Sequence, residues 1–317
     1  MRVVGFTEPG GPDVLSVAEL PEPAPGPGEI RVRVHGAAVN PADTLLRSEP
    51  GAMAATARPH LLGMDLAGVV DRTGADVPFA VGDRVMSVVL PVRHAGGAYA
   101  EYVVVPAEWA VAVPVGIALH EAATVPMNAL TALAAIETME LKEGDVAGVT
   151  GAAGAFGGCL LQLAAARGIR TVADAAPKDE ELVRGLGATW TVSRGPGVAA
   201  RMREVVPGGV DALLDGALLG ADVLDAVRDG GSYAGLRKLG EPGTKPLPPA
   251  PRGISYRGFE VHDWFGRTDL MAEIAAALGA GRLSPRVAEI VPPEQAPRAH
   301  AALDAGGTRG RYVLDFS

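Results

Sequence analysis

Residues 149–158 read VTGAAGAFGG, and this stretch decides how the middle of the chain folds. A short apolar run, DVAGVT (145–150), leads into it and has the length of a buried strand. The segment that follows, AFGGCLLQLAAARG (155–168), has helical spacing of its large apolar residues and a glycine stop at its end. Strand, glycine turn and helix therefore follow one another, which is the context in which a glycine-rich turn binds the phosphates of a dinucleotide.

The glycines of this turn, Gly151, Gly154 and Gly157, are each separated by two residues. Residues without Cβ permit the tight turn, the approach of the backbone to a pyrophosphate and the contact between helix and strand. The N-terminus of the following helix then offers free N–H groups and a partial positive charge to the phosphates. The spacing differs from the commoner Gly-x-Gly-x-x-Gly, so a plain strand-to-helix turn in an alanine- and glycine-rich chain is the alternative.

The next expected strand, IRTVAD (169–174), ends at Asp174. In a dinucleotide fold this is the place of the group that meets the adenosine ribose. A carboxylate there accepts hydrogen bonds from both ribose hydroxyls but repels a 2′-phosphate. The alternative is an exposed acid at the end of a strand.

Strands and helices alternate through the middle of the chain, with further strands expected at VDALLDG (210–216) and GGSYAGL (230–236). This alternation predicts a parallel sheet covered by helices on both faces. The first hundred residues differ, because short alternating runs such as EIRVRVHGAAV (29–39) are separated by Gly, Pro and Asp. They predict a mostly antiparallel β domain.

Composition excludes several classes of function. The chain has 317 residues, a net charge of −9 and no basic cluster, so nucleic-acid binding is not expected. No apolar run is long enough for a membrane span, and the N-terminus lacks a signal-peptide pattern. The one cysteine, Cys159, cannot form an intrachain disulfide. These features predict a soluble cytoplasmic protein.

The chain resembles the zinc-free quinone oxidoreductase (ζ-crystallin-like) branch of the medium-chain dehydrogenase/reductase superfamily. The resemblance runs nearly end to end, and beside the glycine turn it rests on seven segments in order: GGPDVL (10–15), VRVHGAAVNPADTLLRS (32–48), LGMDLAGVV (62–70), VGDRV (81–85), GGAYAEYVVVP (96–106), VPMNALTAL (125–133) and GLGA (185–188). The resemblance implies an α/β protein with a Rossmann-type doubly wound parallel sheet plus a GroES-like, mostly antiparallel β domain. The catalytic β domain is expected from residues 1–117 and 266–317, and the dinucleotide-binding domain from 118–265. It also implies hydride transfer from a nicotinamide cofactor, which carries the chemistry while the protein positions it.

The resemblance assigns roles to individual residues. Asn40, in NPAD, matches the family asparagine near the nicotinamide and is predicted to be catalytic, although an Asx turn before Pro41 also explains it. Thr131 matches a threonine that contacts the nicotinamide portion, and its alternative is a helix-interior residue. Gly235 stands at the end of the strand that closes over the nicotinamide in relatives.

Backbone N–H groups of Ala155, Phe156 and Gly157 are expected on the pyrophosphate. No zinc is expected: a single cysteine excludes a four-cysteine structural site, and Asn40 stands where zinc-dependent relatives have a cysteine.

The choice of cofactor is contested within the sequence. Asp174 favours NADH, whereas the family branch mostly uses NADPH. Lys178 and Arg194, at about the places of the family's 2′-phosphate ligands, are the cations expected to bind it. We therefore expect NADPH, with NADH possible because of Asp174.

The substrate is expected to be a quinone or an α,β-unsaturated carbonyl. The stretch TLLRSEPGAMAA (44–55) lacks the tyrosine acid that enoyl reductases of the superfamily carry there, and no basic run suits coenzyme A. Trp264 and Phe265 are candidates for stacking on a planar substrate or for a core anchor. A homodimer through residues 253–262, with Ile254, Tyr256 and Phe259 at the edge, is implied by the resemblance. An enoyl-thioester reductase of a biosynthetic pathway and a cofactor-binding protein with little turnover are the alternatives.

Overall fold

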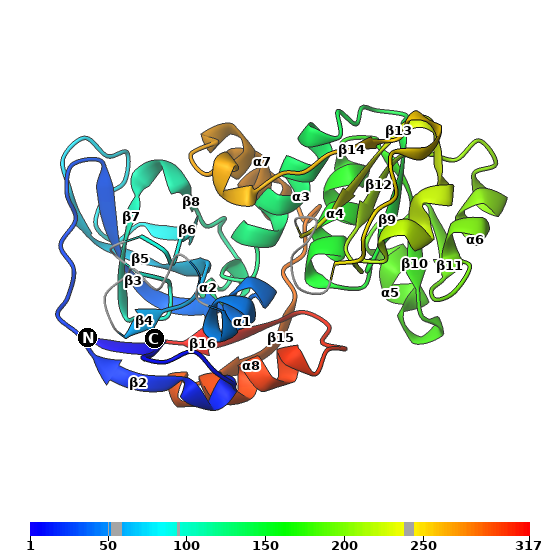
Figure 1. Cartoon of the computed structure of the whole chain (residues 1–317). Helices are drawn as coiled ribbons and strands as arrows, with labels where there is room; N and C mark the ends of the chain where they lie inside the picture. The colour runs from blue at the N-terminus through cyan, green and yellow to red at the C-terminus, as the bar shows by residue number, and fades with distance from the viewer. Residues whose placement is uncertain (50, 52–58, 94–95, 238–243) are drawn as a thin grey trace. The chain divides into compact units, whose positions relative to one another are not determined.

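The computed structural model describes residues 1–49, 51, 59–93, 96–237 and 244–317 (Figure 1). The chain forms two compact units. The first contains Met1–Met127 and Trp264–Ser317, and the second contains Asn128–Asp263. The resemblance implies that both chain ends contribute to one domain, and in the structure the closing strand at residues 311–315 pairs with the early strand at residues 29–38.

The first unit is built on a seven-stranded sheet with the order β15-β16-β3-β5-β6-β8, in which β7 also pairs with β3. These strands are β3 (Glu29–Ala38), β5 (Asp65–Thr73), β6 (Arg84–Val88), β7 (Tyr102–Pro106), β8 (Ala110–Ala112), β15 (Val287–Val291) and β16 (Arg311–Asp315). All of these pairs are antiparallel except β15 with β16. A three-stranded sheet accompanies it, formed by β1 (Arg2–Phe6), β2 (Ser16–Glu19) and β4 (His60–Leu61). The mostly antiparallel β domain is confirmed.

The α-helices in the described part of this unit are α1 (Pro41–Ser48), α2 (Leu119–Ala122), α7 (Thr268–Gly279) and α8 (Ala296–Asp304). Every second residue of β3 from Ile30 to Val34 points into the hydrophobic core of this unit. Ile30, Val32 and Val34 are fully buried, as the period-two pattern of EIRVRVHGAAV predicts. They pack in one hydrophobic cluster with residues from both ends of the chain, including Phe6 and Leu314.

The second unit is a six-stranded parallel sheet with the order β11-β10-β9-β12-β13-β14 (Figure 1). Its strands are β9 (Val146–Thr150), β10 (Arg170–Ala175), β11 (Trp190–Ser193), β12 (Val210–Asp215), β13 (Val227–Gly235) and β14 (Ser255–Tyr256). Its α-helices in the described residues are α3 (Pro126–Thr138, of which the first two residues belong to the first unit), α4 (Ala155–Ala166), α5 (Glu180–Gly185) and α6 (Val198–Val205). The strands expected from the sequence occur within a few residues of their expected ends, so the Rossmann-type parallel sheet is confirmed.

The division between the units differs from the one expected after residue 117. Residues 118–127 belong to the first unit, because α2 contacts β3 and β5 and the Met127 N–H bonds to Asp65 of β5. The helical stretch of the sequence is also interrupted here. Pro126 starts α3 as its first residue, a position where proline is favoured because its missing N–H costs nothing. At the other boundary, Trp264 and Phe265 also lie in the first unit.

Candidate cofactor and substrate site

The glycine turn has the backbone that its sequence demands. Gly151 has a φ of +68°, a conformation that side-chain-bearing residues rarely adopt. A Cβ on Gly157 would lie 2.5 Å from the Gly151 carbonyl oxygen and 2.6 Å from the Ala152 Cα. The first turn of α4 therefore packs directly on the turn after β9, and only glycine permits that approach.

At the N-terminus of α4, the first backbone N–H groups have no acceptor within the helix. Gly154 is the N-cap residue, and the Gly158 N–H makes the bond to the Gly154 carbonyl that starts the helix. The N–H groups of Ala155, Phe156 and Gly157 precede that bond and so have no intrahelical acceptor. Together with the helix dipole they form the type of site that binds a phosphate.

The turn also lies where a parallel sheet binds ligands. Strand β10 lies on one side of β9 and β12 on the other, so the chain reverses its order of strands at β9. Ligands of open α/β sheets bind outside the carboxyl ends of the strands at this point. Thr150, Asp215 and Gly235, at the carboxyl ends of β9, β12 and β13, are in register with one another.

Asp215 is fully buried at that edge and collects hydrogen bonds. Its Oδ1 accepts from the Thr150 hydroxyl at 2.5 Å, and its Oδ2 accepts from the Tyr233 hydroxyl and the Gly220 N–H, both at 2.8 Å. Burial and the nearby Asp215 carboxylate raise the pKa of Tyr233 well above its usual range. These contacts fasten three strand ends to one carboxylate.

Asp174 is also buried, with 5 % of its surface exposed. Its Oδ1 accepts a hydrogen bond from the Ala152 N–H of the glycine turn at 3.2 Å. Burial raises the pKa of the Asp174 carboxyl, while the N–H groups of Ala152 and Gly151 and the Arg194 guanidinium act in the opposite direction. The carboxylate that was predicted to face the ribose is thus turned toward the turn.

Lys178 and Arg194 are both exposed and follow the carboxyl ends of the neighbouring strands β10 and β11. In the described part of the chain, no carboxylate lies within ion-pair distance of either cation. Thr131 is half-buried in α3. The predicted cofactor residues of the second unit thus include a turn, two strand ends and two exposed cations at one edge of the sheet.

Asn40 lies in the first unit, as the N-cap residue of α1, and is 3 % exposed. Its backbone N–H donates to Oδ2 of Asp43 at 2.8 Å, the reciprocal contact of a capping box. Its side-chain Nδ2 donates to Oδ2 of Asp65 at 2.9 Å. Both acceptors fix the orientation of the Asn40 amide.

Asp65 joins Asn40 to the C-terminal strand. Its Oδ2 also accepts from the Arg311 guanidinium at 2.8 Å, and its Oδ1 accepts from the Met127 N–H at 2.5 Å. Arg311 donates further to the backbone carbonyls of Val39 and Thr124. This ion pair is almost completely buried, with side-chain exposures of 3 % and 0 %.

A second buried network starts from Asp43. The Tyr99 hydroxyl bonds to Oδ2 of Asp43 at 3.2 Å and to Nε2 of His300 at 3.1 Å. Arg47 contacts Nδ1 of His300 at 3.0 Å and Asp304 at 2.8 Å. Because a guanidinium only donates, Nδ1 accepts, and neutral His300 carries its proton on Nε2. The bonds then run in one direction, from Arg47 through His300 and Tyr99 to Asp43.

Burial governs the titration of this network. It raises the pKa of Asp43 to about 6, against the opposing N–H groups of Asn40 and Gly63. Burial and the Arg47 charge together lower the pKa of His300 to about 3. At neutral pH Asp43 is therefore ionised and His300 neutral.

Among the described residues, no group of three or more His, Cys, Asp or Glu side chains is placed to hold a metal ion. Both oxygens of Asp65 are occupied by N–H donors, and His60 lies buried with its ring 5.2 Å from that of Phe6. The expectation of a zinc-free protein stays a prediction.

The segments that were expected to surround the substrate lie in different environments. Tyr99 of GGAYAEY is fully buried and belongs to the Asp43 network. Phe265 packs edge-on against Trp109 at 4.9 Å between ring centroids, which supports the core-anchor alternative. Residues 50 and 52–55 of the stretch 44–55 lie outside the described residues.

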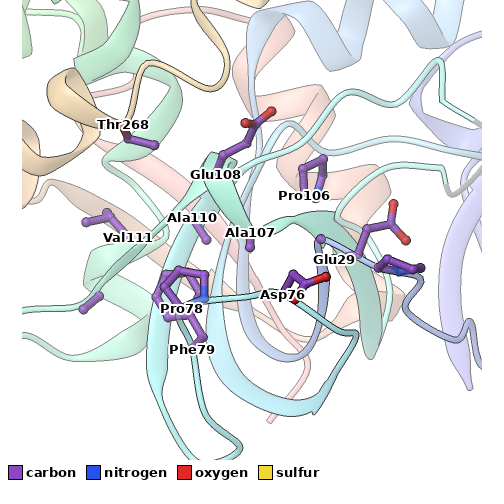
Figure 2. Close-up of a pocket in the computed structure, with 13 residues that line it drawn as sticks. Glu29, Asp76, Pro78, Phe79, Pro106, Ala107, Glu108, Ala110, Val111 and Thr268 are labelled. Carbon is purple, nitrogen blue, oxygen red and sulfur yellow. The ribbon is translucent and has the colours of Figure 1, made fainter.

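A cavity of about 810 Å³ does open on the first unit (Figure 2). Its walls include Pro78, Phe79 and residues 106–108 and 110–112, and Glu29 and Asp76 also line it. None of the predicted site residues is among the residues that line it.

Sequence analysis missed the residues that hold the site residues in place. Asp43 was detectable, because an acid three residues after an N-cap asparagine is the capping-box pattern. Arg311 and His300 gave no local signal, since their partners lie more than two hundred residues away in the chain. Asp215 ends an expected strand, and the register of that strand with β9 was needed to recognise its role.

The comparisons with known proteins bear on both units. Residues 26–115 match the alcohol dehydrogenase GroES-like domain family, and residues 186–314 match the zinc-binding dehydrogenase family. A dehydrogenase of Aspergillus niger, orf1, is 31 % identical over an alignment of 273 positions that covers 78 % of this chain and 78 % of that one. The spectinabilin polyketide synthase system protein NorB of Streptomyces orinoci is 31 % identical over 96 % of this chain, but the chain spans only 14 % of its length.

Solved structures agree with these matches. A mycobacterial quinone oxidoreductase superimposes with a TM-score of 0.82 at 29 % identity, covering 99 % of both chains. A mycobacterial protein solved in complex with NADPH superimposes with a TM-score of 0.84 at 28 % identity, covering 99 % of this chain and 100 % of that one. With its antiparallel β domain built from both chain ends, its parallel sheet and its glycine turn at the switch point, the chain belongs to the quinone oxidoreductase branch of the medium-chain dehydrogenase/reductase superfamily.

Proposed function

We propose that this protein transfers hydride from NADPH to a quinone or an α,β-unsaturated carbonyl without a metal ion. The observation that carries the proposal is the glycine turn at the switch point of the parallel sheet, beside the first N–H groups of α4, which have no acceptor within the helix. NADPH supplies the hydride, and the protein binds and orients the reactants.

The choice of NADPH is supported by two observations. Lys178 and Arg194 stand exposed beyond the carboxyl ends of β10 and β11, where they are available for a 2′-phosphate. The mycobacterial protein of similar fold was solved with NADPH. NADH remains the alternative.

Asn40 is the residue that we propose acts near the nicotinamide. Asp65 and Asp43 hold its side chain and its backbone, so its amide is preorganised before any ligand binds. Reduction of a quinone leaves an oxyanion that water can protonate, and so the absence of a tyrosine in residues 44–55 does not hinder this reaction.

The metal-free character of the proposal is supported by Asp65. A carboxylate whose two oxygens already accept hydrogen bonds from Asn40, Arg311 and Met127 is a poor ligand for zinc. Asn40, with its amide nitrogen directed at that carboxylate, is a poor one too.

A second candidate function is the reduction of an enoyl thioester in a biosynthetic pathway. The names of two relatives favour it, namely the polyketide synthase protein NorB and a trans-enoyl reductase of Aspergillus flavipes. This reaction needs a proton at the carbon next to the carbonyl, and the sequence offers no evident side-chain acid for it.

The test is the oxidation of NADPH and NADH by the purified protein, followed by absorbance with an ortho-quinone and, in parallel, with a crotonyl thioester. Turnover of the quinone with NADPH preferred is the expected result. Turnover of the thioester alone would transfer the proposal to the second candidate. Binding of the cofactor without turnover of either substrate would leave a cofactor-binding protein and overturn both reductase proposals.

We also propose a homodimer formed through residues 253–262. Strand β14 ends the order of the parallel sheet, and an unpaired edge strand is a template for a second chain. Tyr256 and Phe259 are half-buried, whereas Ile254 is 1 % exposed and packs in the core of its own unit. Light scattering after size-exclusion chromatography distinguishes a dimer of about twice the 32.3 kDa chain from a monomer.

A further inference from the structure

The glycine turn is held by side chains on both of its flanks. On the β12 side, the Thr150 hydroxyl accepts the Ala217 N–H at 3.1 Å and donates to the buried Asp215. On the β10 side, Oδ1 of Asp174 accepts the Ala152 N–H. Asp174 of β10 therefore contacts the turn directly and braces it, whereas Asp215 and Ala217 hold Thr150, the residue that precedes the turn.

Asp174 is badly placed to recognise a ribose. A carboxylate that selects NADH has to present its oxygens to both ribose hydroxyls, and this requires them to be accessible. Asp174 is 5 % exposed, and its Oδ1 already accepts a hydrogen bond from the Ala152 N–H of the turn. The Arg194 guanidinium acts to lower the pKa of the Asp174 carboxyl and so favours its charged form.

We propose that Asp174 is a positioning residue that holds the glycine turn in its binding conformation and does not select between NADH and NADPH. The proposal rests on the proposed function, because it assumes that the turn binds a dinucleotide. The sequence suggests that an acid at the end of the second strand of this unit repels a 2′-phosphate. When that acid is buried against the turn, it does not exclude the 2′-phosphate.

The consequence is a specific pattern of affinities. Loss of the brace disturbs the pyrophosphate site, which NADH and NADPH share, so both dissociation constants should rise by the same factor. Removal of a hydrogen bond to a charged group typically changes an equilibrium constant by roughly tenfold or more. A residue that reads the ribose would instead weaken NADH alone and would strengthen NADPH when its charge is removed.

The experiment measures the dissociation constants of NADPH and NADH for the wild type, Asp174→Ala and Asp174→Asn by quenching of protein fluorescence. For Asp174→Ala we expect both constants to rise roughly tenfold with an unchanged ratio. For Asp174→Asn, whose amide oxygen still accepts from Ala152, we expect a smaller rise, again equal for both cofactors. Glu181→Gln, which removes one exposed carboxylate of the same unit, is the control for net charge.

Amide hydrogen exchange at Ala152 provides a readout that does not depend on a cofactor. We expect its exchange to become at least tenfold faster in Asp174→Ala and to stay unchanged in Glu181→Gln. A changed ratio of the two dissociation constants, or unchanged exchange at Ala152, would overturn the proposal. If the wild type bound neither cofactor while Ala152 lost its protection as expected, the proposed function would fail and the brace would stand.

Discussion

Arg311 and Asp65 form an ion pair of 2.8 Å, although 246 residues separate them in the chain. The pair joins the last strand of the first unit, β16, to β5, and Asp65 in turn orients the Asn40 amide. Because neither charge reaches water, each depends on the other. The geometry of the proposed catalytic residue is thus linked to the folding of both ends of the chain.

Removal of either charge should destabilise the protein strongly. Asp65→Asn leaves the Arg311 guanidinium buried without a counter-ion, and we expect the free energy of unfolding to fall by about 3 kcal/mol or more. Arg311→Met should have a similar effect. The double variant Asp65→Asn/Arg311→Met should lose clearly less free energy of unfolding than the two single variants lose together, because it leaves no buried charge unpaired. Urea denaturation at pH 7 measures all three.

The surface pair Arg298 and Glu289 is the matched control. It has a similar distance of 2.6 Å, but its side chains are 48 % and 46 % exposed. Because solvent screens such a pair, Glu289→Gln should change the stability little. Additive losses in the Asp65 and Arg311 double variant would contradict the mutual dependence of the buried pair.

Asp43 and His300 each make the stability of the fold depend on pH, and in the wild type their two contributions largely cancel. The raised pKa of Asp43, about 6, makes the folded state bind its proton more tightly, so this group makes stability fall as the pH rises from about 4 to 6. The lowered pKa of His300, about 3, has the opposite sign and makes stability rise between about pH 3 and 6.5. In the wild type the two slopes oppose each other.

Single variants separate the two slopes. Relative to wild type, His300→Gln should lose roughly 2 kcal/mol of stability between pH 4.5 and 6.5, because only the Asp43 slope remains. Asp43→Asn should gain a similar amount over the same interval. Urea denaturation at several pH values measures both, and slopes of the same sign for the two variants would disprove this assignment.

The sequence predicted the elements more reliably than the interactions among them. The strand β9, the glycine turn and the helix α4 were predicted within a residue or two, because their patterns are local. The orientation of Asp174 was not predictable, since burial against Ala152 depends on how β10 pairs with β9. The same holds for Asp65, because its partner Arg311 lies 246 residues further along the chain.

The division of the chain shows a similar limit. Composition changes near residue 117, but α2 packs on the β domain, because its buried Ala122 and the bond from Met127 to Asp65 attach it there. Composition reports the type of secondary structure and not the sheet on which it packs.

The close packing of Gly157 predicts a loss of cofactor binding in Gly157→Ala. The added methyl group would lie 2.5 Å from the Gly151 oxygen, so the turn or the helix has to move. We expect the dissociation constant of NADPH to rise at least tenfold, as measured by fluorescence quenching, since both elements form the phosphate site. Gly185→Ala is the control, because no atom lies within 4 Å of its added Cβ and alanine favours a helix. Equal affinities in the two variants would contradict the role of the turn.

Lys178 and Arg194 should decide the preference for NADPH. A cation on a phosphate makes a charge-assisted hydrogen bond, and its loss typically costs about 1.5–3 kcal/mol, which is roughly a ten- to hundredfold loss of affinity. Lys178→Ala and Arg194→Ala should therefore weaken NADPH by such factors and leave NADH almost unchanged. Lys142→Ala is the charge-matched control, because Lys142 is exposed but precedes β9 at the opposite, amino end of the strand. A wild type that prefers NADH would refute this assignment directly. Equal weakening of both cofactors in the two variants would refute it as well, since the 2′-phosphate is the only group in which the cofactors differ.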